Sequence, residues 1–471
     1  MVSAGIGRGI GAVLLAALVM LWPALYNGYP LLYPDSMSYL QQGRPVARAL
    51  FLHQFSPYYG GRSLIYSVGI LPLHWNISPW PVVIFNALVT ASILRLVVRS
   101  LLPKQTLAAY FALVVPLSLL TGLGWFVGWI MPDIFGPVLY LAVYLLVFAN
   151  ETLSRAERLT VALIAWWAVA SHVTHLLLAG GLCVLLMAVL IVQRQPTGRA
   201  VRAVGGVAMI VLLAAAAHVS LHAYLYGEPS LNGKRPPFLM ARMIADGPGR
   251  RYLQQQCPNR HLEICGHLHA LPDNVADFLW RADGIWQSAS PQQQERMRNE
   301  EMAVVVGTLR AYPREELRVS ASHFWEQLHT FGLGDYDPRP WILAMVDTVL
   351  PGARARYLKS RQAQETLPAE FFTSVQDWTV IASVMVIACW AMFVRQWGSP
   401  RMIGLTAVIV FVVVANAAVT GVLSNVEDRY QARVIWLVPL LAGVFVLTWL
   451  DHRHRTLRLP HTEGQGQPTG A

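Results

Sequence analysis

Apolar residues gather in ten stretches along the chain, separated by polar or charged segments. Stretches near the length needed to cross the hydrocarbon core of a bilayer predict transmembrane helices. We therefore predict an all-α polytopic membrane protein with about ten transmembrane helices. The expected spans cover about 9–27, 81–102, 106–121, 134–148, 159–170, a sixth ending at 194, 203–224, 378–393, 402–422 and 434–450.

Two longer segments interrupt this pattern. Residues 28–78 form the first external loop, and its apolar residues between 64 and 71 follow helical spacing, which predicts a helix lying on the membrane surface. Residues 225–376 hold most of the soluble-looking sequence, enough for a mainly helical external (periplasmic) domain. The expected divisions are an N-terminal membrane module (1–224), this domain, C-terminal membrane helices (377–450) and a cytoplasmic tail (451–471).

Composition supports the membrane class. The 471 residues are 55% hydrophobic and only 13% charged, and the mean hydropathy is +0.43. A soluble domain carries about a quarter charged residues, so the composition excludes an ordinary soluble protein. The net charge of +10 does not indicate nucleic acid, because Lys and Arg lie mostly beside the apolar stretches, where they set orientation in the membrane.

The positions of Lys and Arg predict one orientation. With the N-terminus in the cytoplasm, every cytoplasmic connection carries positive charge, as the positive-inside rule requires. These charges are Arg8, Arg95, Arg99, Lys104, Arg155, Arg158, Arg194, Arg199, Arg202, Arg395, Arg401, Arg453, Arg455 and Arg458. The opposite side then collects charged residues from five connections, so we expect a site at the external water–lipid boundary.

Asp35 is the first acidic residue of the chain and lies in the external stretch 33–39. An acid at a membrane surface costs stability unless it caps a helix, pairs or reacts, so Asp35 is a candidate functional residue. Pro34-Asp35-Ser36 before an apolar-periodic run is also a normal helix start, which makes a helix N-cap the alternative. Tyr39, at the end of this stretch, is a candidate substrate contact.

A second acid, Asp133, follows Pro132 at the start of another span, and an N-cap is again the alternative. Two carboxylates from separate loops could serve as general base and metal ligand, or share a proton. His172 and His175 are three residues apart, which suits one helix face that binds a phosphate, a metal or a carboxylate. Interfacial histidines bonded to the backbone are the alternative.

Arg429 and Arg433 lie four residues apart in a charge-dense turn before the last span. On a helix they would point the same way and suit a phosphate, because each guanidinium offers a bidentate fork and keeps its charge. Arg44, Arg48 and Arg62 of the first external loop could add to this anion site. Contact with lipid headgroups is the alternative for these three.

Cys257 and Cys265 are eight residues apart in the expected external domain and predict a disulfide if that domain is periplasmic. Three histidines between 261 and 269 suggest zinc as an alternative, but the spacing does not match a zinc finger. The segment 246–249, Asp-Gly-Pro-Gly, predicts a turn that could line the site.

The layout of these motifs resembles the GT-C class of integral-membrane glycosyltransferases, which use polyprenyl-phosphate-linked sugars. The shared features are an Asp at the start of the first external loop, a surface helix after it, a second Asp in the next external loop, and Arg-Tyr near the last spans. The resemblance covers about 1–225 and 378–450 and implies that Asp35 is the base. Members often carry a paired acid in the second loop, whereas Asp133 stands alone.

The resemblance implies an inverting transfer. Asp35 would take the proton of an acceptor hydroxyl, and Arg429 and Arg433 would hold the polyprenyl phosphate leaving group, supported by Arg62 and the histidine pair. The implied partners are the lipid-linked sugar, a glycan, lipid or protein acceptor, and membrane lipids. A divalent metal is the one cofactor left open, with Asp133 as its candidate ligand. The expected location is the bacterial inner (cytoplasmic) membrane, with both termini in the cytoplasm.

Other classes of protein make different demands on the chain. A lipid or solute transporter would show related halves and interrupted helices that meet at mid-membrane. An O-antigen-ligase-like or acyl-transfer enzyme would depend on His172 or His175, with Asp35 dispensable. A non-catalytic assembly subunit would have no donor-sized cavity near Asp35.

Overall fold

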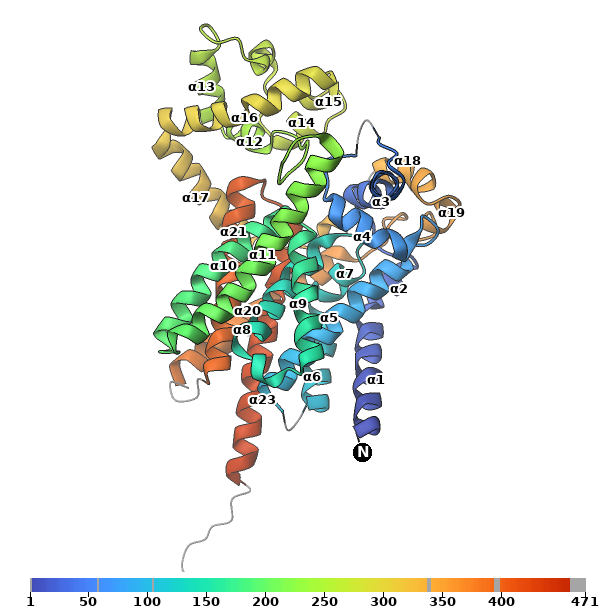
Figure 1. Cartoon of the computed structure of the whole chain (residues 1–471), viewed down its shortest axis with the longest axis vertical. Helices are drawn as coiled ribbons and strands as arrows, with labels where there is room; N and C mark the ends of the chain where they lie inside the picture. Colours follow the sequence, from blue (N-terminus) through green and yellow to red (C-terminus); the bar gives the residue numbers. More distant parts are fainter. Residues whose placement is uncertain (1, 57–58, 104–105, 337–339, 394–398, 458–471) are drawn as a thin grey trace, which may run out of the picture.

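Helices form the regular structure of this chain, seen here in a computed structural model that describes residues 2–56, 59–103, 106–336, 340–393 and 399–457. Within these ranges no strand occurs, and the only β-type pairing is an isolated bridge. Lys104, Arg395, Arg458 and the rest of the tail lie outside the described residues. The all-α membrane fold is confirmed at this level (Figure 1).

Six helices of the described chain are long and apolar enough to cross a membrane. The sixth combines the short helix α22 with most of α23. The spans are α5 (Trp80–Leu101), α10 (Val173–Val192), α11 (Thr197–Tyr226), α20 (Ala369–Phe393), α21 (Pro400–Leu423), and α22 (Asp428–Ile435) with α23 (Leu437–Leu457). They correspond to six of the ten expected spans.

The other four expected spans are not among these six, so a count of ten is not confirmed. They are α1 (Val2–Met20), α6 (Thr106–Leu120), α8 (Phe135–Phe148) and α9 (Arg155–Ala170). At a rise of about 1.5 Å per residue, a helix of 14 residues such as α8 reaches only about 21 Å of a hydrocarbon core about 30 Å thick. Apolar sequence thus marks burial in protein as well as burial in lipid.

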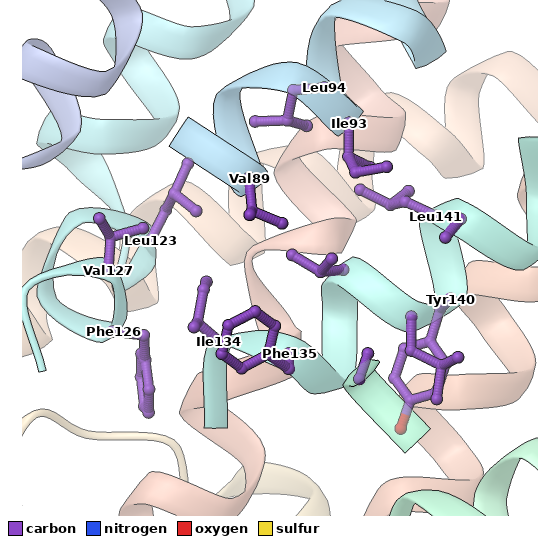
Figure 2. Close-up of a cluster of buried hydrophobic side chains, with 14 of the residues drawn as sticks. Val89, Ile93, Leu94, Leu123, Phe126, Val127, Ile134, Phe135, Tyr140 and Leu141 are labelled. Atoms are coloured by element: carbon purple, nitrogen blue, oxygen red, sulfur yellow. The ribbon is translucent and has the colours of Figure 1, made fainter. Parts of the chain in front are cut away.

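Helix α8 is the centre of the bundle. It contacts α5, α9, α11, α21 and α22, and nearly every side chain along it is buried. Figure 2 shows part of this core, where α5 and α8 meet the short helix α7 (Leu123–Val127). The labelled residues of this cluster are Val89, Ile93, Leu94, Leu123, Phe126, Val127, Ile134, Phe135, Tyr140 and Leu141.

The outer helices present apolar side chains outward. Val184 of α10, Leu212 of α11, Met385 of α20 and Val410 of α21 are all exposed. An apolar surface of this extent would aggregate in water, so it is the surface that contacts lipid. The six spans and this surface together identify a membrane protein.

Ion pairs link several helices at one end of the bundle. At one end Arg99 pairs with Glu157 (2.6 Å) and Arg401 with Glu151 (2.7 Å). These pairs join the end of α5, the short helix η2 (Asn150–Thr152), the start of α9 and the start of α21. Figure 1 shows the N-terminus at this end and the helices α12–α16 at the opposite end.

The segment expected as an external domain divides between two cores. Its first part has a hydrophobic core of its own, around Met240, Phe278 and Val304. The elements here are α12 (Phe238–Ala245), α13 (Pro248–Gln256), η3 (Glu263–Ala270), α14 (Val275–Leu279), α15 (Ile285–Ser288) and α16 (Pro291–Ala311). A disulfide joins Cys257 to Cys265, the pairing that the sequence favoured over zinc.

The second part packs differently. Helix α17 (Pro313–His329) lies along α21, and after η4 (Gly334–Tyr336) the helices α18 (Pro340–Val349) and α19 (Arg354–Tyr357) follow. Their buried side chains, such as Val346 and Tyr357, belong to the main core. The division at residue 376 stays a prediction.

The first external loop forms a helical hairpin of α3 (Pro34–Leu52) and α4 (Leu64–His74), preceded by the short helix α2 (Trp22–Asn27). The expected helix near 64–71 is present, but most of its apolar face is buried against protein. The hairpin is close-packed at Gly43, where a Cβ atom would lie 2.5 Å from the carbonyl oxygen of Ser67. Only glycine allows this approach of the two helices.

Gly43→Ala is expected to destabilise the protein by about 1–3 kcal/mol, because the added methyl group forces α3 away from α4. Gly205→Ala in α11 is the matched control, since its Cβ meets nothing within 4 Å. Thermal unfolding in detergent measures both. An unfolding temperature of Gly43→Ala equal to that of the control would contradict the close packing.

Candidate functional site

Two loops that carry the candidate acids are joined directly. The backbone N–H of Leu31 donates to the carbonyl of Gly128 (2.9 Å), and the N–H of Ile130 donates back to Leu31 (3.2 Å). Gln362 holds the next residue from the other side, because its amide both accepts from the N–H of Leu32 (3.0 Å) and donates to its carbonyl (2.7 Å). The first external loop is thereby fixed beside the loop that precedes α8.

Asp35 is the second residue of α3, not its N-cap. Tyr33 occupies the N-cap position and Pro34 opens the helix. The hydroxyl of Ser36 accepts the N–H of Tyr33 (2.9 Å) and so provides the local cap. The N-cap alternative for Asp35 is therefore wrong, and its carboxylate is directed to other partners.

Those partners are two arginines. Oδ1 of Asp35 lies 2.6 Å from Arg62 and Oδ2 lies 3.7 Å from Arg429. The side chains of Asp35 and Arg429 are 11% exposed and that of Arg62 is 26% exposed. The three form an ion-pair cluster in which Arg62 is the most exposed member, and Arg62 also lies over the ring of Trp280, 5.3 Å from its centre.

Aromatic rings and backbone contacts hold Arg429 in place. Its guanidinium carbon lies 4.3 Å from the ring centre of Tyr33 and 4.9 Å from that of Tyr430. Cation–π contacts of this kind favour one orientation of the planar group. The backbone N–H of Arg429 donates to the carboxylate of Asp335 (3.2 Å), which joins η4 to the start of α22.

The second acid–arginine pair is buried. Asp133 follows Pro132 in η1 (Pro132–Ile134), whose N-cap is Met131. Its carboxylate lies 3.3 Å from Arg433, with side-chain exposures of 5% and 3%. Arg433 also donates to the amide oxygen of Asn416 in α21 (2.9 Å). The N-cap alternative for Asp133 is wrong as well, and this pair acts as an internal link between α8, α21 and α22.

The two histidines bond to backbone and to a neighbouring hydroxyl. The imidazole of His172 accepts the N–H of Thr174 (3.2 Å) and is the N-cap of α10. Nδ1 of His175 donates to the carbonyl of Ala168 (2.7 Å). Burial lowers the pKa of His172 to about 3, and Arg433 is the largest of the charges that add to this effect. The structure shows the backbone-bonded alternative, and phosphate binding by either histidine stays a prediction.

The remaining arginines of the first loop and Tyr39 differ in whether they contact Asp35. Tyr39 is buried one turn after Asp35, with its ring edge-on to Tyr66 at 4.9 Å. Arg44 donates to the carbonyl of Trp75 (2.8 Å), away from the cluster. The structure gives no contact that brings Arg48 to Asp35. Of the three arginines of the first loop, Arg62 alone pairs with Asp35 among the described contacts.

Asp246 lies at a joint between the external helices and the bundle. Its carboxylate accepts from Arg242 (2.8 Å) and lies 3.1 Å from Nε2 of His323. Arg242 in turn donates to the backbone carbonyls of Gly421 and Ser424 at the end of α21. These contacts tie Asp246 to α12, α17 and α21, and the expectation that the 246–249 turn lines the site stays a prediction.

Four residues of the cluster were not singled out from the sequence. Tyr33, Asp335 and Trp280 lie beside the two more exposed arginines, and Asn416 binds Arg433, whereas Tyr430 was noted only as part of the Arg-Tyr pattern. Asn416 had a usable signal, because an amide inside an apolar stretch indicates a polar partner. Nothing in the local sequence marks Asp335 or Trp280, because their partners come from distant segments.

The sequence also left open whether a divalent metal binds near Asp133. Among the residues that the structure describes, no group of three or more His, Cys, Asp or Glu is arranged to hold a metal ion. Asp133, the candidate ligand, faces Arg433.

Comparisons with known proteins gave no match. No family model, no curated protein and no solved structure is significantly similar to this chain.

Asp133→Asn is expected to lower the free energy of unfolding by about 3–5 kcal/mol, because it leaves Arg433 buried without its counter-charge. Asp35→Asn is expected to cost less, since Arg62 stays partly in water. Thermal unfolding of both variants in the same detergent measures the difference. Equal losses would show that the two pairs are equally buried.

Glu316 of α17 provides a pH-dependent prediction. Burial raises the pKa of this carboxyl from 4.5 to about 7, and the negative charge of Asp246 adds to the rise while Arg242 opposes it. The folded protein therefore holds the proton more tightly than the unfolded chain, so stability falls as pH rises from about 4.5 to about 7 and is constant above that range.

Glu316→Gln removes this titration. The variant should lose less stability than the wild type between pH 5 and pH 8, measured by thermal unfolding in detergent. Glu326→Gln, at an exposed position of the same helix, is the control. A wild-type pH dependence retained in Glu316→Gln would contradict the assignment.

Proposed function

We propose that this protein is a membrane glycosyltransferase that moves a sugar from a polyprenyl-phosphate donor to an acceptor hydroxyl. The observation that carries the proposal is the Asp35 carboxylate held between Arg62 and Arg429 at the end of the bundle. A carboxylate can take a proton, and guanidinium groups bind phosphate, so the cluster contains both functions that the transfer needs. Exposed apolar helices beside it suit a polyprenyl tail.

The ion pairs suggest how donor binding prepares the base. In the free protein both oxygens of Asp35 face an arginine. A donor phosphate offers more charge and more oxygens to the same guanidinium groups, so it competes with the carboxylate for them. Movement of Arg62, the more exposed of the two, would leave Oδ1 free for an acceptor hydroxyl.

The proposed chemical step transfers one proton, forms one bond and breaks one bond. The acceptor hydroxyl gives its proton to Asp35 while its oxygen forms a bond to the anomeric carbon. The bond from that carbon to the phosphate oxygen breaks, and the polyprenyl phosphate leaves with the electron pair. Attack opposite the leaving group inverts the anomeric centre. Arg429 stabilises the charge that develops on the phosphate.

Asp133 and Arg433 take a positioning role in this proposal. Each neutralises the other in the core, and Arg433 lies 5.7 Å from the ring centre of Tyr430, the ring that also contacts Arg429. The pair thus supports the arginine that faces the donor. The proposed transfer reaction contains no step that uses a divalent metal.

The proposed location is the bacterial inner membrane. The end with Arg99, Arg401 and the N-terminus would face the cytoplasm, in keeping with the positive-inside rule. Asp35 and helices α12–α16 would then face the periplasm, where the Cys257–Cys265 disulfide is stable.

Asp35→Asn is expected to lower the transfer rate by at least about 100-fold, because an amide cannot take the proton. The assay uses purified protein in bilayer discs with a panel of radiolabelled polyprenyl-phosphate hexoses and pentoses, and follows loss of label from the lipid. Asp273→Asn, an acid exposed to water, is the matched control.

Donor binding provides the second readout. Arg429→Gln should weaken binding of unlabelled polyprenyl phosphate about tenfold or more, measured by native mass spectrometry, whereas Asp35→Asn should retain it. Full transfer by a folded Asp35→Asn protein would rule out this carboxylate as the base. Loss of activity in His172→Ala together with an active Asp35→Asn would favour the acyl-transfer class.

A further inference from the structure

A row of two aromatic rings flanked by two arginines connects Asp35 to helices α12–α16. Arg62, which pairs with Asp35, lies 5.3 Å from the ring centre of Trp280. The rings of Trp280 and Phe238 are 5.8 Å apart, and Arg235 lies 5.8 Å from the ring of Phe238. The row ends at Glu301 of α16, 3.4 Å from Arg235. The row thus runs from Asp35, the proposed base, to helix α16.

Trp280 is the exposed aromatic residue of this row. It is 45% exposed, although it directly follows the buried residues Phe278 and Leu279 of α14. By contrast, Trp286, only six residues further on, is buried in the same core. A Trp that is accessible beside a functional cluster presents a large, rigid apolar surface at low conformational cost.

Backbone contacts at the end of α14 fix the position of Trp280. Its backbone N–H donates to the carbonyl of Ala276 (2.7 Å), closing α14. The following turn is tight at Gly284, where a Cβ atom would lie 2.3 Å from the carbonyl of Asp277. The backbone of Trp280 is therefore fixed at the helix end, and its indole contacts Phe238 and Arg62.

The surroundings of Trp280 indicate water rather than lipid. Arg62 and Arg235 flank the aromatic pair, and Arg281 pairs with Asp283 (2.7 Å) in a well-exposed ion pair next in sequence. An indole that anchors a helix in lipid would instead lie among apolar side chains. A ligand for Trp280 should therefore be water-soluble with one apolar face.

A sugar ring has that character. Its axial C–H bonds form an apolar face that packs on an indole, while its hydroxyl groups reach the charged side chains around the ring. We infer that Trp280 is a carbohydrate-binding platform, which orients a glycan acceptor so that its hydroxyl reaches Asp35. One guanidinium group, that of Arg62, separates the platform from the carboxylate. This inference rests on the proposed function, and it specifies a glycan among the acceptor classes.

The first test does not depend on activity. Full-length protein in bilayer discs is oxidised with hydroxyl radicals in the presence of a panel of hexose, N-acetylhexosamine and pentose oligosaccharides, and oxidation of each Trp is read by peptide mass spectrometry. At least one oligosaccharide should lower the oxidation rate of Trp280 by about threefold or more, while exposed Trp325 of α17 stays unchanged. Protection of neither residue, or of both equally, would overturn the inference.

The second test uses transfer kinetics. Trp280→Ala should raise the acceptor KM about tenfold or more with little change in kcat, and Trp280→Phe should retain most of the affinity because it keeps an aromatic face. Binding of polyprenyl phosphate should be unchanged in both, and Trp325→Ala is the control. An unchanged KM, or a loss of polyprenyl phosphate binding in Trp280→Ala, would show that Trp280 only positions Arg62.

The two proposals fail in different ways. If the wild-type protein transfers no sugar and binds no polyprenyl phosphate, the proposed function is wrong, whereas protection of Trp280 by an oligosaccharide would still identify a carbohydrate site. If transfer occurs and depends on Asp35 but Trp280 is not protected, only the platform is wrong.

Discussion

A carboxylate at the end of an apolar helix bundle requires a cation beside it, and the end of this protein that carries Asp35 is organised around that requirement. Asp35 is neutralised by Arg62 and Arg429, and Asp133 by Arg433. An unpaired charge in such a place would cost several kcal/mol. Each pair joins elements that are far apart in the sequence, so charge neutralisation also determines that α3, α4, α8 and α22 end at one place.

The two neutralised acids differ in what surrounds them. Asp133 and Arg433 are almost fully buried, with Asn416 completing the contacts of the guanidinium. Asp35 and Arg62 remain partly open to solvent. A pair without access to solvent can only support its neighbours, whereas an accessible pair can exchange partners with a ligand. Burial therefore distinguishes two acids that look alike in the sequence, since both follow a Pro at a helix start, and it is the reason why the proposed base is Asp35.

Part of this arrangement follows from the sequence. Asp35, Arg62 and Arg429 could be selected because polar residues beside apolar stretches need partners, and the Cys257–Cys265 spacing predicted the disulfide. The count of spans could not be predicted, because periodicity shows that a segment is apolar but not whether lipid or protein covers it. The spacing of His172 and His175 likewise could not distinguish ligands from a helix cap, since that choice depends on local backbone geometry.

Accessibility within the cluster gives a direction of approach. It increases from Arg433 in the core through Asp35 to Arg62, and then to Trp280 on the external helices. In the proposed transfer, a water-soluble acceptor would meet the indole first and the carboxylate last. A lipid-linked donor would come from the side, where the outer helices expose apolar residues. Two substrates of opposite polarity would then approach Asp35 from different directions, as transfer from a lipid to a soluble acceptor requires.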